Sequence, residues 1–436
     1  MKRRLFFALL LWMVGGVMSV VQAAAGAKIG GRSLASYRIV YAPDAEHEEG
    51  SDAAAYAQQA LQAATGVSPE IVGSDAWKQG SAIRLEHDRA LEPFGYSVRL
   101  EGRAMVVHAG GCWAMQKAVQ LVAEQLKDKG RIPAGYRLEG TVMGEHLFPV
   151  AEGANLRILD DNIWDYSSET IPEAWKPTGI DPRDDVRAPQ FAQLVRAYMP
   201  DIVTLQEYSR HMHDRFYPRI REYGYVISYE SGQDWNNTPI FYNPQTVEQL
   251  YVNYNLYTPA RWSNIGSKSF TSAVFRHKAT GRVFAVLTTH LWWKGESAQP
   301  GSTQARAAQV RLMLAEAEIL RAEYKCPVFV TGDMNCYENS IPIRQFFESD
   351  YKPCYELATQ YADLHNGHHI CSPKDGFSRE SRRRSPERKE GAIDHCLLLD
   401  PKQQVEVKVF DCVQAYFTVL LTDHYPNVID AKLFTK

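Results

Sequence analysis

Several short apolar runs in the second part of the chain each end in a polar residue able to bind a metal or a phosphate. Runs of four to eight such residues predict buried β-strands. Polar side chains just past a strand lie at the rim of the sheet, where α/β proteins tend to build their sites. The runs and their polar ends are 156–159 before Asp160, Asp161 and Asn162; 200–205 before Gln206 and Glu207; 283–289 before His290; 328–331 before Asp333 and Asn335; and 417–421 before Asp423 and His424.

These residue types suit a metal–phosphate site. Magnesium prefers hard oxygen ligands, keeps several waters and takes one or two protein carboxylates. Glu207 is the natural principal ligand, with Asn162 beside it. A histidine held by a carboxylate is basic enough to take a proton from water near neutral pH. A sixth candidate, Asp394, precedes the apolar run 396–399.

Taken together, six motifs resemble the endonuclease/exonuclease/phosphatase superfamily over about Leu156 to Leu433. This superfamily includes pancreatic-type deoxyribonucleases, abasic-site endonucleases, inositol-polyphosphate phosphatases and secreted sphingomyelinases. The resemblance implies a four-layer α/β sandwich of two packed mixed β-sheets flanked by helices, and a Mg²⁺-dependent hydrolase of phosphate esters, with Mn²⁺ or Ca²⁺ as alternatives. The motifs are Asn162-Ile163, Gln206-Glu207, Thr289-His290-Leu291, Gly332-Asp333-Met334-Asn335, Ile393-Asp394 and Asp423-His424-Tyr425-Pro426.

The resemblance also implies catalytic roles. His424 is the general base and Asp394 orients it. Asp333 orients the attacking water or assists the metal, and whether Asp333 or His424 removes the proton stays open. Asn335 donates to the phosphoryl oxygens. His290 donates to a non-bridging oxygen as charge builds in the transition state.

Each of the remaining predicted site residues has two alternative roles. Asp423 contacts the metal or braces the site. Trp292 and Trp293 follow the Thr-His-Leu motif, where adjacent rings at a rim stack on sugar, lipid or base while one of them packs inside. Arg306 lies on the next helix, where a structural role is favoured and substrate binding is the alternative. The basic run 379–389 precedes Asp394 and is either a solvated loop or an anion contact.

The N-terminal part predicts an exported chain with a separate first domain. Residues 1–23 have the basic start, apolar run and small-residue close of a signal peptide, with a retained anchor as the alternative. Residues 24–147 alternate strand and helix signals: strand 38–41, a helix capped at Ser51-Asp52 and ending at Gly66, a hairpin of 96–100 with 104–108, and a helix over 112–127. This small α/β domain loosely resembles the accessory domains of secreted glycoside hydrolases. A linker and a catalytic domain, 156–436, follow.

Charge and location favour a small substrate. The formal net charge is −3 and becomes more negative without the basic signal peptide. Proteins that track nucleic acid usually carry a basic surface, and Trp164 stands where abasic-site enzymes have a carboxylate. We therefore expect a secreted, periplasmic or cell-surface phosphoesterase acting on a small, lipid- or sugar-linked ester, without a transmembrane segment in the mature chain. The alternatives are an extracellular deoxyribonuclease- or ribonuclease-type endonuclease, and a catalytically inactive glycan-binding surface protein.

Overall fold

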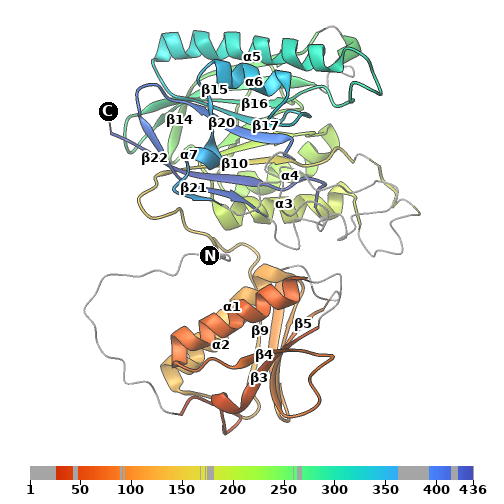
Figure 1. Cartoon of the computed structure of the whole chain (residues 1–436), viewed down its shortest axis with the longest axis vertical. Helices are drawn as coiled ribbons and strands as arrows, with labels where there is room; N and C mark the ends of the chain where they lie inside the picture. The colour runs from red at the N-terminus through yellow and green to blue at the C-terminus, as the bar shows by residue number, and fades with distance from the viewer. Residues whose placement is uncertain are drawn as a thin grey trace. The chain divides into compact units, whose positions relative to one another are not determined.

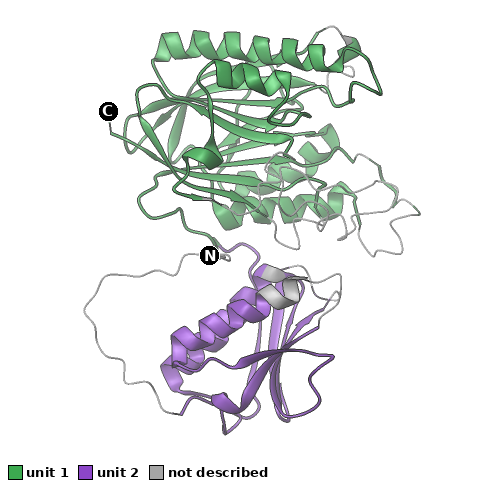
Figure 2. Ribbon diagram, viewed as in Figure 1, with its two compact units in different colours: residues 1–7, 146–414, 418–436 green, residues 8–145, 415–417 purple. Residues whose placement is uncertain are grey.

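The computed structural model describes residues 26–42, 48–88, 91, 94–166, 168–171, 173, 181–258, 260–262, 268–361, 392–413 and 421–435. The described residues up to Glu145 form one compact unit, called unit 2, and those from His146 onward form unit 1 (Figure 2). The predicted signal peptide, the basic run 379–389 and all but the last residue of the predicted strand 417–421 lie outside the described residues.

Unit 2 is built on a six-stranded sheet with the order β4-β3-β5-β7-β6-β9 and a three-stranded sheet with the order β2-β1-β8. Helices α1 and α2 contact each other and the larger sheet (Figure 1). The elements are β1 (Lys28–Ile29), β2 (Arg32–Ser33), β3 (Tyr37–Tyr41), α1 (Glu48–Thr65), β4 (Glu70–Gly73), β5 (Ser81–His87), β6 (Gly95–Glu101), β7 (Ala104–Ala109), α2 (Cys112–Lys129), β8 (Arg131–Ile132) and β9 (Arg137–Thr141).

The local predictions for unit 2 hold with one correction. The hairpin of β6 and β7 pairs Glu101 with Ala104 around the predicted turn. Gly66 follows α1 with φ +75°, a left-handed conformation that glycine adopts without strain. The correction concerns the start of α1, which begins at Glu48 rather than after a cap at Ser51-Asp52.

Unit 1 contains two mixed sheets. The seven-stranded sheet has the order β12-β13-β11-β10-β22-β21-β19, and the six-stranded sheet has the order β14-β15-β16-β17-β20-β18. The strands are β10 (Leu156–Asn162), β11 (Ile202–Gln206), β12 (Val226–Ile227), β13 (Ile240–Tyr242), β14 (Val247–Leu256), β15 (Ser269–His277), β16 (Val283–His290), β17 (Val328–Asp333), β18 (Lys352–Pro353), β19 (Gln360–Tyr361), β20 (Asp394–Leu399), β21 (Val405–Cys412) and β22 (Asn427–Leu433).

The two sheets pack face to face with helices outside. Side chains from both sheets form one core, including Ile158 and Ile429 from one sheet and Phe284 and Phe329 from the other. A second core lies between the six-stranded sheet and its helices. Figure 1 shows α5 and α6 beyond one sheet and α3 and α4 beyond the other. The predicted four-layer sandwich is confirmed. The helices are α3 (Asp184–Tyr198), α4 (Arg210–Glu222), α5 (Ser302–Tyr324), α6 (Ile341–Glu348) and α7 (Cys354–Leu357).

Among the described residues, no helix is both long and apolar enough to cross a bilayer.

Candidate active site

Each sheet has a central pair of parallel strands, and polar site residues lie at the carboxyl ends of both pairs. In the seven-stranded sheet β10 ends at Asn162, opposite Gln206 on β11, so that Glu207 follows directly. In the six-stranded sheet β16 ends at His290, opposite Asp333 at the end of β17. Since hydrogen bonds also join Asn162 to Asp333, the ends of the two pairs meet across the sandwich.

The other predicted catalytic residues, Asp394 and His424, lie at or just before the starts of antiparallel strands. Asp394 begins β20 and pairs with Asp333. His424 lies just before β22, which runs antiparallel to β10. Both side chains therefore enter at the edge where β10 and β17 end.

The metal-side residues are within hydrogen-bonding range of one another. Asn162 Nδ2 donates to Asp333 Oδ2 at 2.9 Å and to Glu207 Oε1 at 3.3 Å. His290 Nε2 lies 3.4 Å from Asp333 Oδ2 and 3.6 Å from Glu207 Oε1. The second carboxylate oxygen of Glu207 accepts the Asp165 N–H at 2.9 Å. Ligand atoms of Glu207, His290 and Asp333 lie within 4.8 Å of one another, so they could hold one ion.

A histidine–carboxylate pair stands beside this group. His424 Nδ1 lies 2.7 Å from Asp394 Oδ2, and Nε2 lies 3.9 Å from Asp333 Oδ2. Asp423 Oδ1 lies 3.8 Å from Nε2, the ring nitrogen of His424 that also faces Asp333. The structure thus brings Asp394, His424 and Asp333 together, and it leaves Asp423 outside both groups able to hold a metal.

Electrostatics keep the facing carboxylates ionised. Burial would raise the pKa of Glu207, but His290 and Lys268 together hold that pKa below its ordinary value. The pKa of Asp333 is lowered against burial in the same way, by His290, His424 and Lys268. Burial alone would lower the pKa of His424, yet Asp394 and Asp423 raise it well above the ordinary value. Two ionised, facing carboxylates suit a divalent cation.

Lys268 is a site residue that the sequence did not reveal. It immediately precedes β15, is buried, and its Nζ contacts His290, 3.0 Å from Nδ1. Burial lowers the pKa of this amine to about 8, while Glu207 and Asp333 oppose the shift. No motif surrounds Lys268 in the chain. Only the pairing of β15 with β16, which puts Ser269 opposite His290, brings it to the site.

Arg187 on α3 connects two segments of the site, and no motif in the sequence pointed to it. All five N–H groups of this buried side chain are used. Nε donates to Pro182 O at 2.7 Å, and Nη2 donates to Trp164 O at 2.9 Å and to Asp184. Nη1 donates to Ile163 O at 2.6 Å and to Leu421 O at 2.8 Å. One guanidinium therefore fixes the turn after Asn162 and the segment before His424.

Backbone conformations at the site are unusual. Glu207 and Asn335 both have positive φ, 54° and 50°. Such left-handed conformations are uncommon for residues other than glycine and cluster at functional sites. Asn335 is held by its N–H, which donates to Asp333 Oδ1 at 2.9 Å, and by Nδ2, which donates to Leu291 O at 3.1 Å and to Asp333 Oδ2 at 3.2 Å.

A polar layer lies between the sheets directly beneath the site. Asp160 Oδ1 accepts from Thr204 Oγ1 at 2.7 Å and from Gln206 Nε2 at 2.8 Å. Gln206 also reaches Thr288 Oγ1 at 3.0 Å, and Thr331 Oγ1 donates to Thr204 Oγ1 at 2.9 Å. These bonds cross from one sheet to the other and hold the strand ends that carry the site in register.

Of the predicted substrate-binding residues, Trp292 and Arg306 have structural roles instead, which for Arg306 is the role that the sequence analysis favoured. Trp292 is 2% exposed, packed edge-on against Trp262 with ring centroids 5.7 Å apart, so no ring face is open to a substrate. Arg306 is buried and its Nη1 donates to Trp292 O at 2.9 Å and to Lys294 O at 2.8 Å. Arg306 therefore shapes the loop after β16. Trp293 is 51% exposed, with Lys294 Nζ 5.3 Å from its ring centroid.

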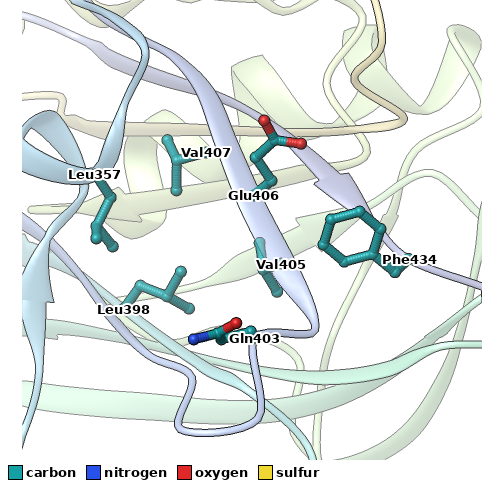
Figure 3. Close-up of a pocket in the computed structure, with 7 residues that line it drawn as sticks. All are labelled: Leu357, Leu398, Gln403, Val405, Glu406, Val407 and Phe434. Atoms are coloured by element: carbon teal, nitrogen blue, oxygen red, sulfur yellow. The ribbon is translucent and has the colours of Figure 1, made fainter.

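A separate pocket of about 520 Å³ lies away from this site. Its lining includes Leu398 near the end of β20, Val405 at the start of β21 and Phe434 beyond β22 (Figure 3). The site is at the start of β20 and β22, so the pocket belongs to the opposite edge of the sheets.

Comparison with known proteins agrees with this geometry. A model of the Endonuclease/Exonuclease/phosphatase family matches residues 181–402, just over half of the chain. The chain belongs to this family. Metal-dependent hydrolysis of phosphoesters is typical of family members. The match covers Glu207, His290, Asp333 and Asp394, whereas Asn162 and His424 lie outside it. No curated protein matches the chain.

Solved structures align with about two thirds of this chain. A mannosyl-6-phosphatase of Bacteroides thetaiotaomicron is 18% identical with a TM-score of 0.50, and the match covers 64% of this chain and 99% of that one. An endonuclease/exonuclease/phosphatase of Bacteroides vulgatus is 22% identical with a TM-score of 0.47, covering 64% and 98%. The catalytic domain of human Nocturnin is 17% identical with a TM-score of 0.45, covering 65% and 96%.

Proposed function

We propose that the chain is a secreted, Mg²⁺-dependent phosphoesterase that hydrolyses a small, lipid- or sugar-linked phosphodiester or phosphomonoester. One observation carries the proposal: two buried groups, Glu207–His290–Asp333 and Asp333–Asp394–His424, share Asp333 at the edge where both sheets end. A phosphate between these groups would have a cation site on one side and a histidine–carboxylate pair on the other.

The donor set fits magnesium. Glu207 and Asp333 offer ionised oxygens. Asn162 presents Nδ2 to both carboxylates while its Oδ1 accepts the Trp164 N–H at 3.0 Å, so Asn162 would ligate the ion only after its carboxamide turned the oxygen toward the site. Bound there, the ion would polarise the phosphoryl oxygens and offset charge that builds on the leaving group. Mn²⁺ or Ca²⁺ would use the same oxygen ligands, and Asp423 could approach the ion only through a water or a rotated side chain.

His424 in its neutral form is positioned to take a proton from the attacking water. Because Asp394 and Asp423 raise its pKa well above the ordinary value, we expect this neutral form, and with it the rate of hydrolysis, to increase as pH rises. Asp394 at 2.7 Å holds Nδ1, which leaves Nε2 facing Asp333 and the phosphate position. The carboxylate fixes one tautomer and stabilises the imidazolium that forms. Asp333 orients the water in this arrangement.

Three groups would bind the phosphoryl oxygens. His290 carries an N–H donor at the end of β16. Asn335 would donate its Nδ2 to the phosphate in place of its present acceptors, Leu291 O and Asp333 Oδ2. Lys268 adds a positive charge in contact with His290. Preorganised donors of this kind stabilise charge that develops in the transition state.

Two features support a small substrate over a polymer. The formal charge of the chain is −3, whereas proteins that bind long nucleic acid are usually basic. An exposed indole, Trp293, lies three residues beyond His290 and offers a face to a sugar ring or a lipid. Export of the protein rests on the signal-like segment 1–23.

The experiment is a panel of phosphodiesters and phosphomonoesters, including a mannose 6-phosphate ester and plasmid DNA, assayed with Mg²⁺ and then with EDTA. We expect turnover of a small ester that stops on chelation. Glu207→Ala and His424→Ala should each slow it at least about a hundredfold with the fold intact. Activity indifferent to EDTA would refute the mechanism, and steeply salt-dependent nicking of DNA would replace the substrate class with nucleic acid. Glycan binding that survives Glu207→Ala, without turnover of any ester, would identify an inactive binding protein.

A further inference from the structure

Helix α5 exposes an unbroken apolar line. Five exposed residues, from Ala308 to Ala322, follow one another along the sequence at intervals of four, three, four and three. This spacing places them in one line along the helix. Leu312 is 51% and Ile319 58% exposed. The opposite face of α5, including Val310, Met313 and Leu320, fills the core against the six-stranded sheet. The line is therefore separate from the buried face. It consists of Ala308, Leu312, Ala315, Ile319 and Ala322, called here the α5 line.

Within the described part of the chain, helices α2 and α4 carry no such apolar line. A surface helix normally carries polar residues on its outer face. The exposed positions within α2 are Gln120, Glu124, Lys127, Asp128 and Lys129, and those within α4 are Arg210, Asp214, Pro218, Arg221 and Glu222. The α5 line departs from this pattern because it has no charged or hydrogen-bonding side chain.

The charged residues beside the α5 line are complementary to the same residues of a second copy. Arg311 and Glu318 are both exposed and precede Leu312 and Ile319, so they share one edge of the line. If a second α5 runs antiparallel with Leu312 beside Ala315 of the second copy, Arg311 meets Glu318 of that copy, and the reverse pair forms as well. Flanking charges of this type set orientation and partner choice between helices. Within its own chain Glu318 pairs with Arg321, an exposed contact of little energetic worth.

The same register places large residues over small ones. Leu312 faces Ala315 of the second copy, and Ile319 faces Ala308, on both sides of the centre. Alternating large and small side chains let two helices approach to about 8 Å. A surface that matches itself in shape and charge under a two-fold rotation is what an isologous dimer requires.

We propose that two copies of this chain associate through antiparallel contact of their α5 lines. The contact is one helix wide, and α5, with 23 residues, is about 34 Å long. A contact one helix wide buries an area at the low end of those seen in stable interfaces. The dimer is therefore reversible, and the fraction of the chain that is dimeric depends on concentration. The proposal is independent of the catalytic function.

Sedimentation equilibrium of the full chain over a range of concentrations tests the association. The wild type should approach twice the mass of one chain as concentration rises. Leu312→Glu should raise the dissociation constant at least about tenfold, since it puts a charge on the apolar line. The matched control is Leu256→Glu, which replaces a leucine that is 50% exposed on β14. A wild type that stays monomeric at every concentration, or a dimer that Leu312→Glu leaves unchanged, overturns the proposal.

Charge reversal tests the register. Arg311→Glu and Glu318→Arg should each weaken self-association, because like charges then face one another. The two single variants mixed together should form a heterodimer, and the double variant should associate as the wild type does. Failure of both the mixture and the double variant to recover association would reject the antiparallel register.

Discussion

At the scale of single residues, the site depends on side chains of two kinds. Glu207, Asp333, Asn335, His290 and His424 end or follow apolar runs, so the sequence reveals them through their motifs. Lys268 and Arg187 sit in no motif, and only strand pairing and helix packing bring them to the site. Sequence patterns therefore report the strand ends well and the supporting cations poorly.

Lys268 provides the first prediction. Lys268→Met should lower kcat/KM at least about tenfold, because it removes a preorganised charge beside the phosphate position. Lys268→Arg should retain more activity than Lys268→Met. Initial-rate measurements with the ester identified by the panel check this, and Lys278→Met, at an exposed lysine, is the control. Unchanged rates in Lys268→Met would assign the lysine a packing role alone.

At the scale of elements, four of the five apolar runs form strands, although not with all the predicted bounds. Of the fifth run, 417–421, only Leu421 is described and it lies in a turn, and the strand that follows His424, β22, was not predicted. β10 continues to Asn162, beyond the predicted end at 159, because Asp160 and Asn162 are still paired with β11. Asp160 belongs to the strand because its side chain is hydrogen-bonded inside the polar layer between the sheets and is not exposed to solvent. An apolar pattern cannot reveal a polar interior.

Gly332 gives a prediction for the contact between β16 and β17. Its φ is +126°, and a Cβ there would lie 2.2 Å from the backbone oxygen of Thr289. Gly332→Ala should therefore lower the free energy of unfolding by about 2–4 kcal/mol and reduce activity by displacing Asp333. Gly281→Ala is the control, since its Cβ would meet nothing within 4 Å and its cost should be near 1 kcal/mol. Urea denaturation compares the two, and equal losses would contradict the steric argument.

His395 on β20 predicts a loss of stability in acid. Burial lowers the pKa of this side chain to about 4, despite its contact with Cys336 O at 2.8 Å. The unfolded chain has the ordinary pKa near 6.5, so it binds the extra proton first and stability falls as pH drops from about 6.5 toward 4. The full effect is about 3 kcal/mol. His395→Gln should lose less stability than the wild type between pH 7.5 and pH 5 in urea denaturation, whereas a parallel loss would exclude this histidine as the cause.

At the scale of the whole molecule, a buried ion pair joins segments far apart in the chain. Arg157 on β10 contacts Asp430 on β22 at 2.6 Å and also donates to Tyr198 O at 2.8 Å. Neither residue stood out in the sequence, since a lone arginine in an apolar run resembles a surface position. The pairing of β10 with β22 places Arg157 in the interior.

The prediction here is a thermodynamic cycle. Arg157→Met should lower the free energy of unfolding by about 3–5 kcal/mol, because it leaves Asp430 charged and unpaired in the interior. Adding Asp430→Leu should recover part of that loss. Chemical denaturation of the wild type, both single variants and the double variant measures the coupling, and strictly additive losses would show that the pair does not interact.

The place of β22 has a consequence for how the chain acquires activity. This strand lies between β10 and β21 in the interior of its sheet, and its partners on β10 precede it by 267 to 275 residues. Pairings at such sequence separation carry a large loop-closure cost and slow folding. An emerging chain therefore holds Glu207, His290 and Asp333 long before the segment carrying His424 can dock. Hydrolytic competence should appear in one late step, when β22 enters the gap between its neighbours.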